Sequence, residues 1–362
     1  MCREHGRPDM GGLPQSARPD LQECMDANLA AALTASDVGV VDIRSSIESW
    51  PLARPFRISR GVKSAAEVIV VEITAHGLTG RGEAVPYARY GETPDSVLAQ
   101  VREVMAPLAA GAGRDALPAL LPAGAARNAI DCALWDFDAK RGAVRLPGAP
   151  EPIATALTVG LDTPDAMAAA AAALAAVPLV KVKVNARDPE ACLRAVRAAA
   201  PGPRLIVDPN ESWTLDLLDR MQPVLAELRV DFVEQPLPAD ADEGLSGFGR
   251  AVPICADESV HVGDDLDRLS GCYDMINIKL DKTGGLTTAL SLLDAARARG
   301  FGVMVGCMVS TSLSIAPALH VAMRADYADL DGPWWLTADR PGGVTIERGM
   351  LLPPASGFWG DA

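Results

Sequence analysis

Four short apolar runs in the middle of this chain each close on a charged residue, and they recur at nearly even steps. They span residues 179–183, 205–208, 230–234 and 254–257, so the charged ends Lys183, Asp208, Glu234 and Asp257 lie 25, 26 and 23 residues apart. One strand, one helix and two loops occupy about this length, which predicts a βα repeat with a charge at each strand's carboxyl end. A charge beside a buried strand is costly, so we expect these charges to share a purpose.

The repeat continues on both sides of these runs. Strands are predicted to begin near residues 153, 179, 204, 230, 253, 274, 301 and 327, with helical segments in the gaps. The first is expected to run over 153–159 without a break. Eight such units predict an α/β fold, a TIM-type (β/α) barrel over residues 149–338. A chain of 362 residues has room for one smaller domain as well.

The region before the barrel divides into two parts. Residues 1–38 are rich in Pro, Gly, Arg and Asp, which predicts a disordered extension. Residues 39–148 predict an α+β domain, with a first strand over 38–43 and 47–50, a second over 66–74, and a hairpin to a third. Its helices begin at Thr93, as an N-cap before Pro94, and near residue 123. Residues 339–362 are too few for a domain, and we expect them to pack back on this one.

Charge and composition narrow the possible partners and the compartment. A net charge of −14 argues against nucleic acid or an anionic membrane as a partner. No apolar run approaches the ~20 residues of a membrane helix, and the N-terminus has no apolar core typical of a secretory signal. The seven cysteines include no CxxC pair and indicate reduced thiols. We therefore expect a cytoplasmic protein.

Three of the charged strand ends are carboxylates, namely Asp208, Glu234 and Asp257. Oxygen ligands from successive strand ends suit a hard cation such as Mg²⁺, which keeps its other positions for water or substrate. Each acid on its own could simply cap the next helix. Three at matched strand ends favour the metal site.

Two lysines flank the three carboxylates. Lys183 ends the second predicted strand and Lys279 the sixth, which lie on opposite sides of an eight-strand ring. Opposed amines suit proton transfer at a carbon, because one can remove a proton from one face while the other delivers a proton to the opposite face. Such bases must be partly neutral, and desolvation or a nearby cation lowers the pKa of a lysine. Either lysine alone could instead form a salt bridge, but both together favour catalysis.

These residues resemble the enolase superfamily, in its muconate-lactonising branch. The motifs are Lys181-Val-Lys183, Asp208-Pro-Asn210-Glu211, Glu234-Gln235-Pro236, Ala256-Asp257-Glu258-Ser259 and Ile278-Lys279. Within that branch the chain looks most similar to the L-Ala-D/L-Glu epimerases, on stretches at 86–92, 121–128, 277–285, 306–308 and 328–332. The resemblance covers about residues 40–350. Pro209 departs from it, since a small residue is more usual after the metal aspartate, and we expect little harm because a residue before proline prefers extended geometry.

The resemblance implies a role for each site residue. Lys183 and Lys279 would be the paired acid/base lysines, and Asp208, Glu234 and Asp257 the Mg²⁺ ligands. Lys181 would bind the substrate carboxylate, and Asp329 with Asp331 the α-ammonium group of a dipeptide, which two carboxylates complement physically. Thr158 and Met308 would line the same pocket. The N-terminal domain would cap the barrel, with Arg60 or Arg89 pairing with a glutamate side chain, Arg60 being favoured.

The implied reaction is Mg²⁺-dependent epimerisation of the C-terminal residue of a dipeptide, L-Ala-D-Glu above all, in murein peptide recycling. An N-acylamino-acid racemase, a cycloisomerase or an o-succinylbenzoate synthase remains an alternative on the same site, as does a silent barrel that only binds a small ligand. Substrates without a free ammonium group fit Asp329 and Asp331 less well. The resemblance also implies a tendency to form homo-oligomers, and the oligomeric state and the side-chain preference stay open.

Overall fold

The computed structural model describes residues 41–58 and 61–361. The predicted N-terminal extension and Arg60 therefore lie outside the described residues. Within the described ranges, no helix is both long and apolar enough to cross a membrane.

The N-terminal domain is built on an antiparallel sheet in the order β1-β2-β3. Its strands are β1 (Asp42–Ile58), β2 (Gly61–Ala75) and β3 (Leu78–Ala84). The β2–β3 turn uses His76 at φ 53° and Gly77 at φ 77°, the pair of positive φ values that a tight hairpin favours. β1 is longer than predicted. It continues past Trp50 to Ile58, and its register with β2 shifts between Pro51 and Phe56, because prolines cannot donate to the ladder.

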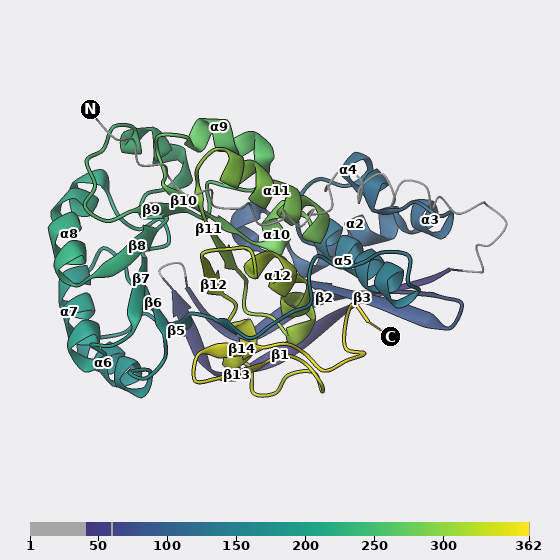
Figure 1. The fold of residues 1–362 in the computed structure, drawn as a ribbon, viewed down its shortest axis with the longest axis horizontal. Coiled ribbons are helices and arrows are strands. Elements are labelled where there is room, and N and C mark those ends of the chain that lie inside the picture. Colours follow the sequence, from purple (N-terminus) through teal and green to yellow (C-terminus); the bar gives the residue numbers. More distant parts are fainter. Residues whose placement is uncertain (1–40, 59–60, 362) are drawn as a thin grey trace, which may run out of the picture. The chain divides into compact units, whose positions relative to one another are not determined.

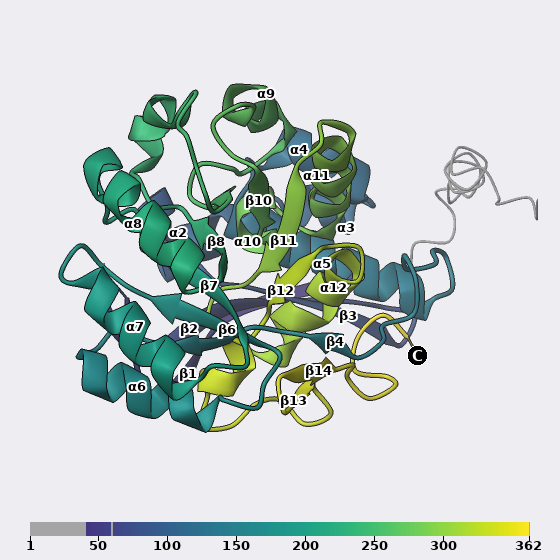
Figure 2. The ribbon, with the colours of Figure 1, turned by 60° about the vertical axis from the view of Figure 1, so that its left-hand side comes forward.

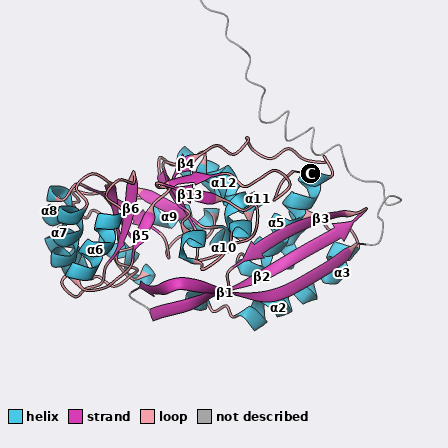
Figure 3. Ribbon diagram, turned by 90° about the horizontal axis from the view of Figure 1, so that it is seen from below, coloured by secondary structure: helices cyan, strands magenta, loops and turns pink. Residues whose placement is uncertain are grey.

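Helices cover one face of this sheet (Figure 3). They are α2 (Pro94–Glu103), α3 (Met105–Ala109), α4 (Leu117–Leu120) and α5 (Ala125–Lys140). Thr93 caps α2 as predicted, and its hydroxyl accepts the Ser96 N–H at 3.1 Å. α5 packs very closely on β3, because a Cβ on Gly82 would lie 2.0 Å from the Ala129 carbonyl oxygen. Glycine is therefore required there, and the buried faces of sheet and helices form a core of their own.

The second layer of the fold is a parallel eight-stranded sheet curled into a barrel, which confirms the predicted fold class (Figures 1 and 2). Its strands in order are β5 (Leu157–Val159), β6 (Leu179–Lys183), β7 (Arg204–Asp208), β8 (Val230–Glu234), β9 (Ile254–Ala256), β10 (Met275–Ile278), β11 (Gly302–Gly306) and β12 (Tyr327–Asp329). The helices outside them are α6 (Pro164–Ala173), α7 (Pro189–Ala199), α8 (Leu215–Glu227), α9 (Leu266–Leu269), α10 (Leu280–Thr283), α11 (Leu286–Ala298) and α12 (Ser312–Ala322). Ile206, Phe232 and Met304 help to fill the barrel interior, so it is a packed core.

The predicted continuous strand over 153–159 is wrong. Its first part, β4 (Ile153–Ala154), pairs antiparallel with β14 (Met350–Leu352), which in turn pairs with β13 (Thr345–Glu347). Only β5 joins the barrel. The chain changes partners between the two parts, because the Thr155 N–H donates to the Gly349 carbonyl and the next N–H, of Ala156, to the Ala328 carbonyl.

The C-terminal segment contacts two parts of the molecule. β13 and β14 extend the small sheet with β4. Further on, the Trp359 indole donates to the Arg81 carbonyl on β3 at 3.0 Å, and the Gly360 N–H donates to Asp136 on α5 at 2.6 Å. The segment therefore ties the outside of the barrel to the N-terminal domain.

Candidate active site

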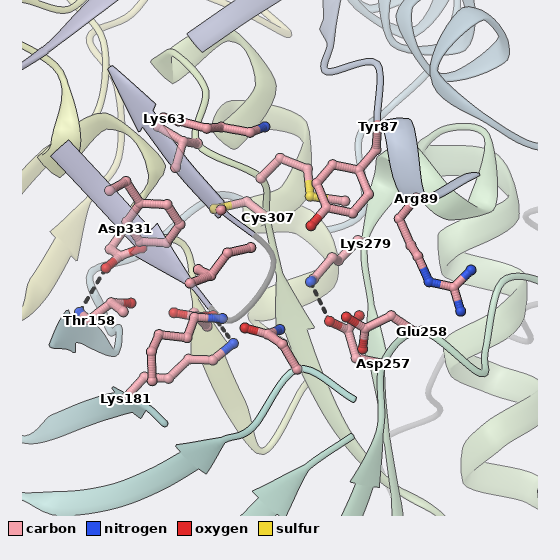
Figure 4. A pocket seen from close by; sticks show the side chains of 18 of the residues that line it. Lys63, Tyr87, Arg89, Thr158, Lys181, Asp257, Glu258, Lys279, Cys307 and Asp331 are labelled. Carbon is pink, nitrogen blue, oxygen red and sulfur yellow. Dashed lines mark hydrogen bonds and ion pairs between the residues drawn. The ribbon is translucent and has the colours of Figure 1, made fainter. Parts of the chain in front are cut away.

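The carboxyl ends of the barrel strands bring most of the predicted site residues to one rim. They surround a cavity of about 470 Å³. The barrel contributes Thr158, Lys181, Lys183, Asn210, Asp257, Glu258, Lys279, Cys307, Met308, Asp329 and Asp331 to its lining. The N-terminal domain closes it with Phe56, Ile58, Val62 and Lys63 from the β1–β2 hairpin and with residues 87–90. Figure 4 shows Lys63 and Tyr87 across the cavity from Lys181 and Asp257.

The two opposed lysines each contact one carboxylate. The Lys183 ammonium lies 2.5 Å from Asp208 Oδ2, and the Lys279 ammonium lies 2.6 Å from Asp257 Oδ2. All four side chains are buried. They come from the ends of β6, β7, β9 and β10, so the structure holds the two amines on different sides of one cavity.

Lys181 lies at the centre of this group. Its ammonium is 2.9 Å from Asp208, 2.6 Å from Glu234 and 2.8 Å from Asp329, and its side chain is only 2 % exposed. Burial lowers the pKa of Lys181, but these three carboxylates outweigh burial and the pKa lies well above its usual range. Lys181 is therefore a fixed positive charge between the predicted metal ligands and the predicted ammonium site.

Burial and neighbouring charges shift the pKa values of the site residues in different directions. Burial raises the pKa of Glu234 to about 8, and Asp208 adds to the rise. Burial opposes ionisation of Asp208 too, but Lys181 and Lys183 hold the pKa of Asp208 below its usual range. The pKa of Lys279 shifts in the opposite direction to the lowering expected from the sequence. Burial lowers its pKa, but the Asp257 and Glu234 carboxylates outweigh burial and raise the pKa of Lys279 well above the usual value.

The carboxylates Asp208, Glu234 and Asp257 are the candidate donors for a divalent cation at the rim. Within residues 41–58 and 61–361, no three His, Cys, Asp or Glu side chains stand together at metal-binding distances, because lysine ammonium groups lie between the carboxylates. The chemistry of Asp208, Glu234 and Asp257 nevertheless fits a hard cation, since all three offer oxygen. Buried Glu234 Oε2 makes no hydrogen bond of good geometry, and Glu234 needs positive charge nearby to stay ionised.

Pro209 leaves the strand end intact. Asp208 stays in β7, and its Oδ1 accepts the Asn210 N–H at 2.8 Å across the proline. The chain then turns through two residues with positive φ, Asn210 at 46° and Glu211 at 65°. The proline therefore begins a tight turn that also anchors Asp208, the predicted metal ligand.

Asp329 ends β12 and Asp331 follows it, and Figure 4 shows Asp331 across the cavity from Lys279. Asp331 Oδ2 accepts the Thr158 N–H at 2.8 Å and the Trp335 indole N–H at 3.3 Å. Burial and the neighbouring Asp329 raise the pKa of Asp331 to about 6. Asp329 Oδ1 is buried and has no hydrogen-bond partner. A pair of buried carboxylates with a spare acceptor suits a cationic group of a ligand.

Arg89, one of the two predicted arginines, and Lys63 both line the cavity from the N-terminal domain. Arg60 lies outside the described residues. Arg89 makes a bidentate pair with Glu211, at 2.8 and 2.7 Å, and so holds the 3₁₀ turn η1 (Ala88–Tyr90) against the barrel. Lys63 was missed. It lines the cavity from the start of β2, with its ammonium 5.2 Å from the centre of the Tyr87 ring. The sequence signal was a second cation three residues after Arg60.

Gly306, at the end of β11, was also missed. A Cβ there would lie 3.1 Å from Lys279 Cε and 2.7 Å from the amide oxygen of Asn277. Asn277 is fully buried and donates its amide to Glu234 Oε1 at 2.8 Å. The absence of a side chain at position 306 therefore makes room for the Lys279 amine and for an amide that orients Glu234.

Two family descriptions match nearly all of the described chain. "Mandelate racemase / muconate lactonizing enzyme, N-terminal domain" matches residues 40–147, and "Enolase C-terminal domain-like" matches residues 165–358. Among curated proteins, the L-Ala-D/L-Glu epimerase of Escherichia coli K12 is 49% identical over 84% of this chain and 97% of its own length. The N-acetyl-D-glutamate racemase of a Pseudoalteromonas species is 43% identical over 82% of this chain and 96% of its own.

Solved structures agree with these matches. An enolase family member from Agrobacterium tumefaciens, described as homologous to dipeptide epimerases and solved with sodium and L-Ala-L-Glu, superposes with a TM-score of 0.86. It is 45% identical, over 88% of this chain and 99% of that chain. The dipeptide epimerase of Enterococcus faecalis, solved with Mg²⁺ and L-Leu-L-Tyr, is 29% identical over 88% of this chain and 97% of that chain, with a TM-score of 0.80.

Proposed function

This chain belongs to the mandelate racemase/muconate lactonizing enzyme family of the enolase superfamily and is an isomerase of the epimerase type, and from that premise we propose that it epimerises dipeptides at the α-carbon of the C-terminal residue. One observation carries the proposal. A single buried cavity has two amines on different sides and a pair of carboxylates, Asp329 and Asp331, at one end. The amines suit proton transfer, and the carboxylates suit the α-ammonium group of a peptide.

In the proposed reaction, Lys183 and Lys279 act on opposite faces of the α-carbon. One lysine takes the α-proton as a free amine, and the other, as an ammonium, delivers a proton to the opposite face, so configuration inverts with no net proton change. Lys181 binds the peptide's carboxylate. Mg²⁺ held by Asp208, Glu234 and Asp257 would supply positive charge for the oxygens of that carboxylate as the α-proton leaves.

The substrate we favour is L-Ala-D-Glu or L-Ala-L-Glu, which places the enzyme in the recycling of murein peptides. Asp329 Oδ1, buried without a hydrogen-bond partner, offers an acceptor to the alanine ammonium. Lys63 lines the same cavity from the N-terminal domain and offers a cation to the glutamate side chain, the role that the sequence predicted for Arg60. An acidic side chain on the substrate matches this cationic wall.

A second candidate is racemisation of an N-acylated glutamate, which the 43% identity to an N-acetyl-D-glutamate racemase favours. Both substrates share the glutamate half and differ at the nitrogen. An N-acyl group carries no positive charge, so it would leave buried Asp329 and Asp331 without a cationic partner. That cost favours the dipeptide.

The test is to incubate the purified protein and Mg²⁺ in D₂O with L-Ala-L-Glu or with N-acetyl-L-glutamate. Proton NMR follows loss of the α-proton signal, and chiral chromatography follows inversion. We expect exchange and inversion at the glutamate of the dipeptide and far slower turnover of the N-acetyl compound. Turnover of N-acetylglutamate alone would transfer the assignment to the second candidate. No exchange in either compound or in a small panel of dipeptides would refute both.

Two variants sharpen the assignment of the bases. Lys183→Ala and Lys279→Ala should each lose inversion, yet each should keep α-proton exchange for the one enantiomer whose proton faces the remaining lysine. The matched control is Lys140→Ala, which removes a lysine paired with Asp136 at 2.8 Å in α5, far along the chain from the rim. Equal exchange of both enantiomers by either rim variant would contradict the two-base arrangement.

A further inference from the structure

Lys282 is a buried lysine beside the site whose role has not been accounted for. It lies in α10, three residues beyond Lys279, and its side chain is 1 % exposed. It does not line the cavity that Lys279 lines. Its ammonium instead contacts Asp257, and Lys282 lines a second cavity together with Tyr90 and Glu258. A fully buried charge is retained only when its partners are well placed.

All three N–H groups of this ammonium have a partner. Lys282 donates to Asp257 Oδ1 at 2.6 Å, to the Asp257 carbonyl at 2.5 Å and to the Asn277 carbonyl at 3.0 Å. Three acceptors in different directions fix the position of the ammonium, and charge-assisted bonds are the strong ones. Lys282 therefore joins the ends of β9 and β10.

Asp257 has a partner at each of its polar atoms. The Asp257 N–H donates to Gln235 Oε1 at 2.9 Å. Lys282 donates to the Asp257 carbonyl and to Oδ1, and Lys279 donates to Oδ2 at 2.6 Å. One carboxylate oxygen is thus held by Lys282, and the other is held by Lys279, which lines the cavity. The two lysines prevent free rotation of the Asp257 carboxylate, and they do so in the absence of substrate.

Gln235 is itself held in a costly conformation. It follows Glu234 directly and has φ 37°, which non-glycine residues rarely adopt. Its amide nitrogen lies 2.9 Å from the Leu237 carbonyl, the Ser259 hydroxyl and the Tyr273 hydroxyl. Gln235 therefore connects the strand end that carries Glu234 to the one that carries Asp257.

We propose that Lys282, with Gln235, is a positioning residue that sets the orientation of the Asp257 carboxylate for metal binding and for contact with Lys279. The inference rests on the metal site of the proposed function, but not on the identity of the substrate. Partners that orient a metal ligand typically contribute 10–100-fold to metal affinity or activity. Lys282 does not line the cavity that we propose for the substrate.

The test measures metal binding without substrate. Lys282→Met keeps the length of the side chain and removes the charge and the donors. We expect the dissociation constant for Mg²⁺, measured by calorimetry on metal-stripped protein, to rise about 10–100-fold. The control Lys140→Met removes another largely buried lysine, which donates to Asp136 and the Thr79 carbonyl in the N-terminal domain. It should lower the melting temperature and leave the Mg²⁺ affinity unchanged.

Other outcomes separate the possible errors. Lys282→Met that binds Mg²⁺ as tightly as wild type would overturn the inference, as would an equal loss of affinity in Lys140→Met. If Lys282→Met does not fold, Lys282→Gln, which keeps one donor group, carries the same test with the same expectation and the same refuting result. Loss of Mg²⁺ affinity in a protein that epimerises no dipeptide would support the role of Lys282 while refuting the proposed substrate. A wild-type protein that binds no divalent cation would overturn both.

Discussion

Gly306→Ala is the sharpest test of how the barrel makes room for Lys279, one of the two proposed bases. The new Cβ would lie 3.1 Å from Lys279 Cε and 2.7 and 2.8 Å from the two amide atoms of Asn277. Ordinary contacts between such atoms begin near 3.4 Å, so the lysine must give way by about 0.3 Å and the amide by about 0.7 Å. Gly306 does not have a positive φ, so the effect comes from space alone.

The expected cost falls on catalysis. A misplacement of ~1 Å can cost ~10²-fold in rate, so a few tenths of an ångström at Cε, increased toward the amine, should lower kcat about 10–100-fold. The shifted Asn277 amide also disturbs Glu234, to which it donates. Overpacking should cost a further ~1–3 kcal/mol of folding free energy. Steady-state kinetics by chiral chromatography and urea unfolding measure the two effects separately.

Gly302→Ala is the matched control, because Gly302 begins the same strand, β11. Its Cβ would meet Met275 Cγ at 2.7 Å, at the opposite end of the barrel from the rim. Stability should fall by a similar amount, while kcat should stay within twofold. The reasoning is refuted if both variants lose the same stability and Gly306→Ala keeps the wild-type kcat.

Three further predictions concern pH, metal and the N-terminal domain. Burial raises the pKa of Asp131 to about 6 from an unfolded value of ~3.9, so protonation of Asp131 favours the folded state. About 3 kcal/mol of unfolding free energy is therefore lost as pH rises through 6. The unfolding free energy, measured with urea from pH 4 to 8, should depend less steeply on pH in Asp131→Asn, and an equal dependence would contradict this. Mg²⁺ at 100 times its dissociation constant should stabilise the EDTA-treated protein by about 2.7 kcal/mol in thermal unfolding, and an unmoved melting temperature would argue against the metal site. Arg89→Ala removes a pair whose arginine is 41% exposed, so stability should fall by less than ~1 kcal/mol while KM rises; an unchanged KM would show that the pair does not hold the turn at 88–90.

The rim could be predicted because a barrel repeats its geometry. The carboxyl ends of parallel strands meet at one edge of the sheet. Even spacing and a charge at each strand end were therefore enough to assign Lys183, Asp208 and Glu234 to the same rim of the barrel. Residues outside that period carried no such signal. Lys282 lies one helical turn past its strand, and Arg89, although named as a candidate, pairs with Glu211 at a separation of 122 residues that no spacing indicates.

Strand boundaries failed where the chain exchanges partners. The apolar run from Ile153 to Val159 reads as one strand, because periodicity reports burial and not the identity of the neighbouring strand. The structure divides it at Thr155 and Ala156, whose N–H groups donate to Gly349 and Ala328. The sequence of β14 holds no mark of this pairing, which depends on where the tail returns.

The same exchange of partners leaves the barrel with a seam. Among the described residues, no ladder joins β5 to β12, and the Ala156 N–H to Ala328 bond crosses between the two. Nearer the rim, the carboxylate of Asp331 accepts the Thr158 N–H in place of a backbone carbonyl. Amide hydrogen exchange at Thr158 should therefore slow when the ammonium group of a ligand binds Asp331. Ligand binding would then also stabilise the contact between the first and last strands of the barrel.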